Sequence, residues 1–124
     1  MDLKFSANEL QQFRNNEQIV RETAEQVIKD FYLFGLDVNF PENIHWAYDE
    51  LYHQLLAHID RMLSLDDKKL LALLYQIDVS EKKIQVESQN QPEKSLAVVV
   101  TELILDRELK KVLTRLYFKN LTDK

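Results

Sequence analysis

The chain has few places at which regular structure can be broken. It contains one glycine, Gly35, and two prolines, Pro41 and Pro92, among 124 residues. Sheet folds need many tight turns and use glycine and proline to make them. A few long helices are therefore expected. Hydrophobic residues make up 45% of the chain and charged residues 30%, as in globular domains, and a chain of this length can bury a core without a metal or a disulfide.

The clearest helical pattern lies in the first third of the chain. Ser6 and Glu9 have the spacing of a capping box, which marks the start of a helix. Apolar side chains then recur at steps of three and four, with Glu17 filling one gap, and Gly35 can supply the left-handed residue that ends the helix. The pattern predicts one helix over about residues 7–34. Its apolar stripe consists of Leu10, Phe13, Val20, Ala24, Val27, Phe31 and Phe34.

The rest of the chain predicts three further helices. A first-turn proline, Pro41, suits the second helix, and an aspartate cap at Asp66 or Asp67 begins the third. The third helix is apolar on nearly all sides, so it is expected to be the most buried element, and Pro92 opens the fourth. The predicted ranges are about 42–64, 67–78 and 93–119.

Residues 79–91 are the least regular segment, and they are predicted to form a loop or an extra helical turn beginning near Ser80. Helices joined by short links favour antiparallel neighbours. The whole chain, residues 1–124, is therefore predicted to be a single all-α domain, an antiparallel up-and-down four-helix bundle.

The three histidines all lie on the second predicted helix, and two of them have a spacing to glutamate that occurs in metal sites. Glu50 and His53 form an E-x-x-H pair, as do Glu42 and His45, and ferritin-like bundles hold metals with such pairs. Those bundles place the pairs on different helices, whereas both pairs lie on one helix here. Glu50 and His53 also face away from the apolar stripe, so no metal or other cofactor is expected.

His58 falls on the shoulder of the same stripe, and a basic residue, Arg61, follows three positions later. The segment from Ala57 to Met62 resembles the histidine region of phosphotransfer (HPt) domains, which are four-helix bundles of similar length. The resemblance implies a signalling protein phosphorylated on His58. That family usually has a small residue, mostly glycine, at the position of Met62, which here belongs to the apolar stripe. His53 lies opposite the stripe and is expected in solvent.

Two carboxylates interrupt apolar stripes, Glu17 in the first helix and Glu102 in the last. A buried carboxylate without a partner costs on the order of several kcal/mol, so each should be paired or lie at an edge. An antiparallel first helix pair would bring Glu17 level with His58 and Arg61, so these two residues are its candidate partners; the alternatives are a role in aligning the helices or exposure at the edge of a groove. Trp46, the only tryptophan, lies off the stripe, where it could pack under the linker or contact a partner.

The composition disfavours several functions. Cysteine is absent, which excludes thiolate catalysis, thiolate zinc sites and iron–sulfur clusters. The net charge of −5 disfavours nucleic-acid binding, and the six basic residues within 107–124 suit the C-terminal end of a helix. No glycine-rich phosphate loop or nucleophile motif is present, so neither enzyme activity nor a small-molecule ligand is expected.

The longest apolar run, residues 96–105, is too short to span a bilayer, and the N-terminal residues lack a signal-peptide pattern. A cytoplasmic protein without membrane contact is therefore expected. The sequence predicts a protein-interaction or structural module that presents a helical face or groove to a protein partner, with self-association as a homodimer left open. The alternatives are phosphotransfer and, third, metal binding. The residues expected in an interaction or polar network are Trp46, His53, His58 and Glu17.

Overall fold

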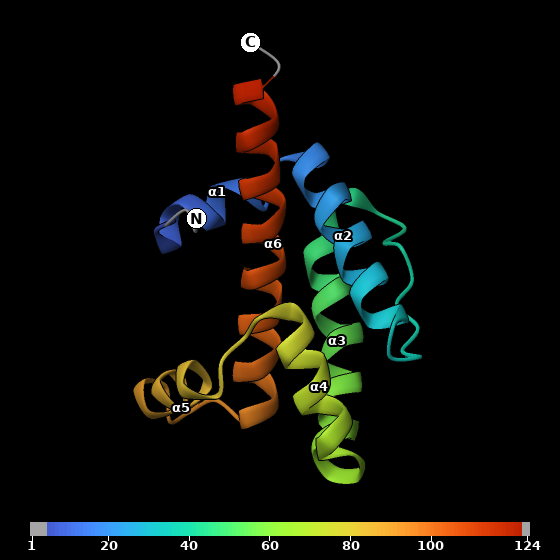
Figure 1. The fold of residues 1–124 in the computed structure, drawn as a ribbon, viewed down its shortest axis with the longest axis vertical. Coiled ribbons are helices and arrows are strands. Elements are labelled where there is room, and N and C mark those ends of the chain that lie inside the picture. The colour runs from blue at the N-terminus through green and yellow to red at the C-terminus, as the bar shows by residue number, and fades with distance from the viewer. Residues whose placement is uncertain (1–4, 123–124) are drawn as a thin grey trace.

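The computed structural model describes residues 5–122, and helices make up nearly all of their regular structure (Figure 1). These residues contain six α-helices, one 3-10 turn and no strand, which confirms the all-α prediction for the described part. The four-helix up-and-down bundle is not confirmed, because six helices replace the four. The elements are α1 (Ala7–Phe13), α2 (Glu17–Tyr32), η1 (Ile44–Trp46), α3 (Ala47–Leu65), α4 (Asp67–Ile77), α5 (Glu81–Asn90) and α6 (Leu96–Thr122).

The longest helix, α6, forms the axis of the fold (Figure 1). It contacts α2, α3, α4 and α5, and α3 and α4 pack against each other as consecutive helices. The main core lies where α2, α3, α4 and α6 meet, and a smaller apolar cluster joins α1 to the C-terminal half of α6. Fully buried members of the main core include Phe31, Leu55, Ile59, Leu73, Ile77 and Ile104.

The single helix predicted over residues 7–34 is wrong, because the chain breaks into α1 and α2. The Asn16 side chain accepts a hydrogen bond from the Ile19 amide at 3.1 Å and so caps a new helix. Asparagine competes for backbone donors and favours caps over helix interiors, a local effect that apolar spacing does not register. The predicted start and the predicted stop of this region are both confirmed. The capping box starts α1, and Gly35 takes the left-handed conformation (φ 71°) just after α2.

The second and third predicted helices also differ in detail. Pro41 is buried in the linker rather than in a first helical turn, and η1, capped by Asn43, precedes α3. Asp66 is the N-cap of α4, as predicted, with its carboxylate accepting from the Lys69 amide. However, α4 is not buried on all sides, because Leu71 is 48% and Tyr75 89% exposed. The fold leaves one apolar side of α4 uncovered.

Residues 79–91, predicted as a loop or an extra turn, are mostly helical. Asp78 ends α4 in the left-handed conformation (φ 73°), and Ser80 then caps α5 by accepting from the Lys83 amide at 3.1 Å. None of the α5 side chains is fully buried. This helix therefore lies on the surface beside α6 rather than in the core (Figure 1).

The last helix, α6, begins at Leu96 and not directly after Pro92. The Ser95 hydroxyl accepts a hydrogen bond from the Val98 amide at 3.2 Å, which is the bond of a helix N-cap. The valines at 98–100 are helical despite their strand propensity, because they pack within a long helix. Among residues 5–122, no helix has both the length and the apolar character needed to cross a membrane.

Candidate functional site: an apolar groove lined by four helices

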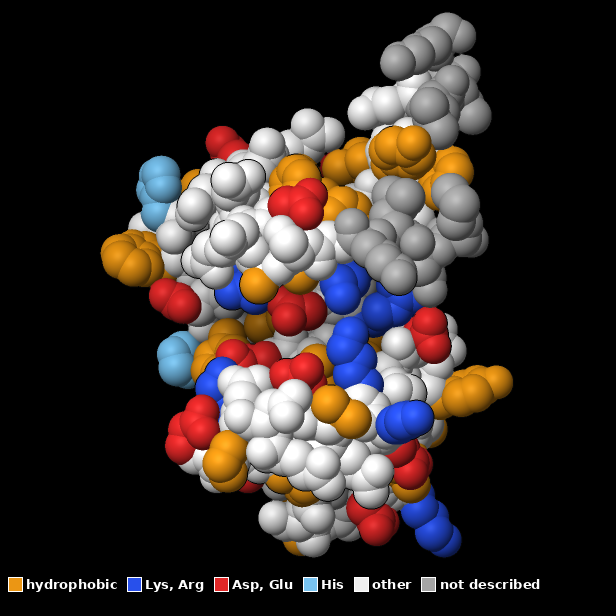
Figure 2. All heavy atoms as spheres, turned by 90° about the vertical axis from the view of Figure 1, so that its left-hand side faces the viewer, with side chains coloured by type: hydrophobic (Ala, Val, Ile, Leu, Met, Phe, Trp, Pro, Cys, Tyr) orange, Lys and Arg blue, Asp and Glu red, His pale blue; other side chains and the backbone are white. Residues whose placement is uncertain are grey.

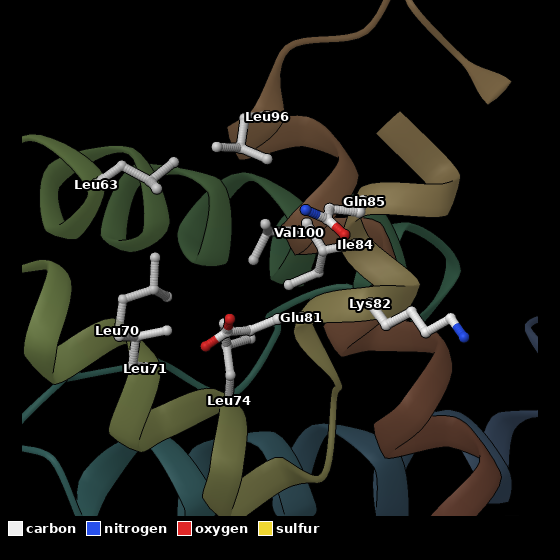
Figure 3. A pocket seen from close by; sticks show the side chains of 10 residues that line it. All are labelled: Leu63, Leu70, Leu71, Leu74, Glu81, Lys82, Ile84, Gln85, Leu96 and Val100. Atoms are coloured by element: carbon white, nitrogen blue, oxygen red, sulfur yellow. The ribbon is translucent and has the colours of Figure 1, made fainter. Parts of the chain in front are cut away.

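An apolar groove lies where α3, α4, α5 and the start of α6 meet (Figure 3). Its volume is about 620 Å³, and seven of its ten lining residues are leucine, isoleucine or valine. Large contiguous apolar surfaces on a soluble domain commonly mark binding sites. The apolar lining consists of Leu63 from α3, Leu70, Leu71 and Leu74 from α4, Ile84 from α5, and Leu96 and Val100 from α6.

The groove stays open because α5 is too polar to fill it. The sequence of α5, EKKIQVESQN, has only two large apolar residues, Ile84 and Val86, and only Ile84 lines the groove. On α4, Leu70 and Leu74 are buried, whereas Leu71 on the neighbouring side is 48% exposed. Leu96 at the start of α6 is also 48% exposed. Two helices therefore present leucines that the fold itself does not cover.

The polar groups of the groove all come from α5, namely Glu81, Lys82 and Gln85. Figure 3 shows the Glu81 carboxylate pointing across the groove toward the α4 leucines, while the Lys82 ammonium points away. Glu81 forms no ion pair with any side chain in the described part of the chain. The groove thus combines an apolar floor with one unpaired negative charge at its edge.

A separate polar feature joins α2 to α6, where Asp30 is 4% exposed and Glu108 is fully buried. The Lys111 ammonium lies 3.3 Å from Asp30 Oδ2 and 3.1 Å from Glu108 Oε1, and Gln26 donates to Asp30 Oδ2 at 3.1 Å. Burial, and next the hydrogen bond and charge of Asp30, raise the pKa of Glu108 to about 9, although Lys111 opposes the shift. Glu108 is therefore protonated at neutral pH. Neither carboxyl lines the groove.

The half-buried His58 ring is engaged with the linker that follows α2. Its Nε2 lies 2.7 Å from the Asp37 carbonyl oxygen, and because a carbonyl can only accept, Nε2 carries the proton. Its ring centroid is 6.2 Å from that of Phe31. A hollow of about 340 Å³ beside it is also lined by Arg61 and Lys69. Phosphorylation at Nε2 would first have to break the bond to Asp37.

Neither candidate partner of Glu17, His58 or Arg61, pairs with it, whereas the alternative of exposure at an edge is confirmed. The break between α1 and α2 places Glu17 in the first turn of α2, where it is exposed and pairs with Arg21 four residues later, at 3.0 Å. Glu102 does have a partner: the Lys94 ammonium lies 3.0 Å from its Oε1. Both carboxylates thus lie at edges, and the buried acids of the fold are other residues.

Trp46 and His53 are both exposed, Trp46 to 62%. The His53 ring stands edge-on to Tyr52, with centroids 5.4 Å apart. Glu50, from the E-x-x-H motif, accepts a hydrogen bond from the Glu42 amide at 3.0 Å and so fastens the linker to α3. No group of three or more potential metal ligands occurs within residues 5–122. The four predicted site residues therefore do not form one site.

Two features escaped sequence reasoning, the groove and the buried carboxyl pair. Glu108 is four residues from both Ile104 and Val112, so the apolar stripe of α6 passes through it. That spacing was a usable signal for a buried carboxylate. The groove had no such signal, because the exposure of Leu71 depends on where α5 lies relative to α4.

No protein-family model, no curated protein and no solved structure matches this chain. Function is therefore inferred from the groove and the side chains that line it. The groove offers a continuous binding surface, which the dispersed histidines and Trp46 do not.

Proposed function

We propose that the protein is an interaction module that binds an amphipathic helix of a partner protein in the apolar groove. The main support is the exposure of Leu71 and Leu96, each 48%, at the rim of a groove lined by leucines. An amphipathic helix presents apolar side chains at steps of three and four, and such a stripe fits a groove between helices. Its binding would remove both leucines from water, which is the driving force for association.

The negative charge at the edge of the groove also constrains the sequence of the partner helix. The Glu81 carboxylate points across the groove and has no cationic partner in the described residues (Figure 3). The partner helix should therefore carry a lysine or arginine beside its apolar stripe, so that the charge is paired when water leaves. The net charge of −5 also favours encounter with a basic segment.

Two rival functions have less support. A small-molecule site usually combines apolar walls with polar groups that converge on the ligand, whereas the polar groups here come from one helix and Lys82 points away. Phosphotransfer through His58 remains the alternative from another class, supported by the neighbouring Arg61 and Lys69. It requires the bond from Nε2 to the Asp37 carbonyl to open.

Selection of helical peptides against the protein tests the proposal. Helix-forming peptides from a displayed random library would be selected for binding, and the affinity of the selected peptides measured by fluorescence anisotropy. The Leu71→Glu variant places a charge in the groove. The Leu65→Glu variant makes the same change at a leucine that is 75% exposed and lies outside the groove. Because both side chains are exposed, both variants should fold.

The expected result is that selected peptides share an apolar stripe with an adjacent basic residue. They should bind the Leu71→Glu variant at least about tenfold more weakly than wild type, and the Leu65→Glu variant with unchanged affinity. Peptides that tolerate Leu71→Glu would contradict the proposal.

The other occupant that must be distinguished from a partner helix is a second copy of the same chain. Sedimentation equilibrium at high micromolar concentration should show a monomer if the groove is kept for another protein. A wild-type dimer that Leu71→Glu dissociates and Leu65→Glu does not would instead assign the groove to a second copy of the chain.

A further inference from the structure

The break between α1 and α2 interrupts an apolar pattern that continues through it in the sequence. Leu10 and Phe13 on α1 keep the helical spacing of Val20 and Ala24 on α2, so on one straight helix these four side chains would share a face. The break contains no glycine or proline, and no residue in it forbids a helical backbone. One straight helix is therefore a second conformation open to this segment.

The bend depends on the backbone of one residue, Asn16. The Arg14 amide donates to the Leu10 carbonyl at 3.2 Å, and the next two amides donate to carbonyls three residues back, at 3.2 and 3.1 Å. The chain thus still turns as a helix up to Asn16, where a φ of −87° and a ψ of 117° are extended. Straightening the segment costs the bond from the Ile19 amide to the Asn16 side chain, but it provides backbone acceptors for the first amides of α2.

A small set of side chains holds α1 on the rest of the fold. Leu10 is its one buried residue, and Phe13 also packs in the apolar cluster with the C-terminal half of α6. Arg14, directly after α1, lies 2.8 Å from Asp106, and its guanidinium carbon lies 4.7 Å from the ring centroid of Tyr48. Each of these contacts is made by a side chain, so α1 can leave without disturbing the backbone of another helix.

The surroundings of α1 also leave it room to move. A hollow of about 280 Å³ separates it from α5, and Figure 2, which looks onto this side, shows charged side chains between the upper and lower parts of the molecule. Helices as short as α1, with 7 residues, are marginal in water on their own. This segment therefore stays helical when it is docked on α6 or when it continues α2.

A straight helix cannot keep α1 on the α6 of its own chain. The two long helices run antiparallel: Asp30 pairs with Lys111, and Gln26, four residues earlier, with Arg115, four residues later. At this spacing residue 18 comes level with the described end of α6 at Thr122. A straight α1 would project past that end, about 15 Å or more from the face of α6 that now holds it. The apolar residues of this α1-binding face are Leu109, Val112, Leu113 and Leu116.

We propose that two copies of the chain exchange α1. In each copy α1 and α2 form one helix, and α1 docks on the α1-binding face of the other copy. The face fits this occupant because it already holds the same segment, and every contact broken within a chain reforms between chains. The Asn16 cap favours the bent monomer, so it sets how readily the exchange occurs. None of the residues of this face lines the apolar groove, so the exchange is independent of the proposed function.

Sedimentation equilibrium from micromolar to millimolar concentration tests the exchange. Asn16→Ala removes the cap and favours the straight helix, whereas Asn16→Asp keeps a cap of similar strength and is the matched control. Loss of the cap favours straightening roughly fivefold per chain, and a dimer needs two straight chains. Asn16→Ala should therefore dimerise roughly 25-fold more tightly than wild type. Wild type and Asn16→Asp should dimerise only toward millimolar concentration.

NMR on an equimolar mixture of isotope-labelled and unlabelled Asn16→Ala chains identifies the contact. Nuclear Overhauser effects between chains should connect Leu10 and Phe13 with Leu109 and Val112, which meet within one chain in the monomer. Adding Leu71→Glu should leave this dimer intact, which distinguishes it from a dimer formed through the groove.

Three results would overturn the exchange. The first is an Asn16→Ala variant that dimerises no more tightly than wild type up to millimolar concentration. The second is an Asn16→Asp variant that dimerises as tightly as Asn16→Ala, because the cap would then not control the hinge. The third is a dimer without contacts between α1 of one chain and the α1-binding face of the other.

Discussion

Replacing Glu108 by glutamine removes one of the two ionisable groups of the buried carboxyl pair. The glutamine keeps the shape of the side chain and has an amide that can donate a hydrogen bond to Asp30. Burial and the neighbouring Asp30 raise the pKa of Glu108 from 4.5 to about 9, so this carboxyl takes up a proton when the chain folds at neutral pH. Since the protonated form is the one favoured by folding, its contribution to stability is fully present below pH 4.5 and is lost as the pH rises toward about 9.

The size of this pH dependence follows from the single proton that Glu108 takes up on folding. Between about pH 5.5 and pH 7.5 the linkage is roughly 1.4 kcal/mol per pH unit, so wild type should lose about 2.7 kcal/mol of unfolding free energy relative to the Glu108→Gln variant. In a domain of this size that corresponds to roughly 10 °C in Tm. The variant should therefore become progressively more stable than wild type as the pH rises.

Urea unfolding followed by circular dichroism at several pH values measures the difference. The control is Glu102→Gln, the same substitution on the same helix, at a carboxylate that is 41% exposed and paired with Lys94. Its unfolding free energy should run parallel to that of wild type over this pH range. A constant difference between wild type and Glu108→Gln from about pH 5.5 to pH 7.5 would refute the raised pKa of Glu108.

Three further outcomes are expected. Asn16→Ala should cost about 1 kcal/mol in urea unfolding because it removes the cap of α2, whereas Asn15→Ala, whose side chain caps nothing, should be nearly neutral. Gly35→Ala should cost about 1 kcal/mol, because its φ of 71° disfavours a Cβ even though no atom lies within 4 Å of one; an unchanged midpoint would contradict this. Incubation with acetyl phosphate should give no phosphohistidine by mass spectrometry, because His58 Nε2 is bonded to a carbonyl; a phosphate that is lost in His58→Gln would restore the phosphotransfer alternative.

Signals that act within one helical turn were readable from the sequence. The capping box at Ser6, the stop at Gly35 and the cap at Asp66 all lie where they were predicted. The break at Asn16 was missed because apolar spacing continues across it, while the deciding interaction is one hydrogen bond from a side chain to the backbone. Two short helices therefore looked like one long helix.

The candidate site depended on tertiary arrangement and could not be read in the same way. The helix α5 has few apolar residues, so its sequence gave no strong helical periodicity, and its position beside α6 is what leaves Leu71 uncovered. The histidines attracted attention because of their chemistry, yet the fold distributes them over different surroundings. Glu108 was predictable from the stripe of α6, whereas its partner Asp30 comes from a distant helix.

The central claim is that the groove around Leu71 and Leu96 receives a helix of another protein. A photoreactive amino acid placed at each of these positions, and at Leu65 as the control outside the groove, tests it directly in cells that produce the protein. Mass spectrometry of the cross-linked peptides would identify the segment captured from each position. Positions 71 and 96 should capture the same amphipathic helical segment, with a basic residue beside its apolar stripe, and position 65 should not. Identical captures from positions 65 and 71, or captures from 71 and 96 with no segment in common, would contradict the account.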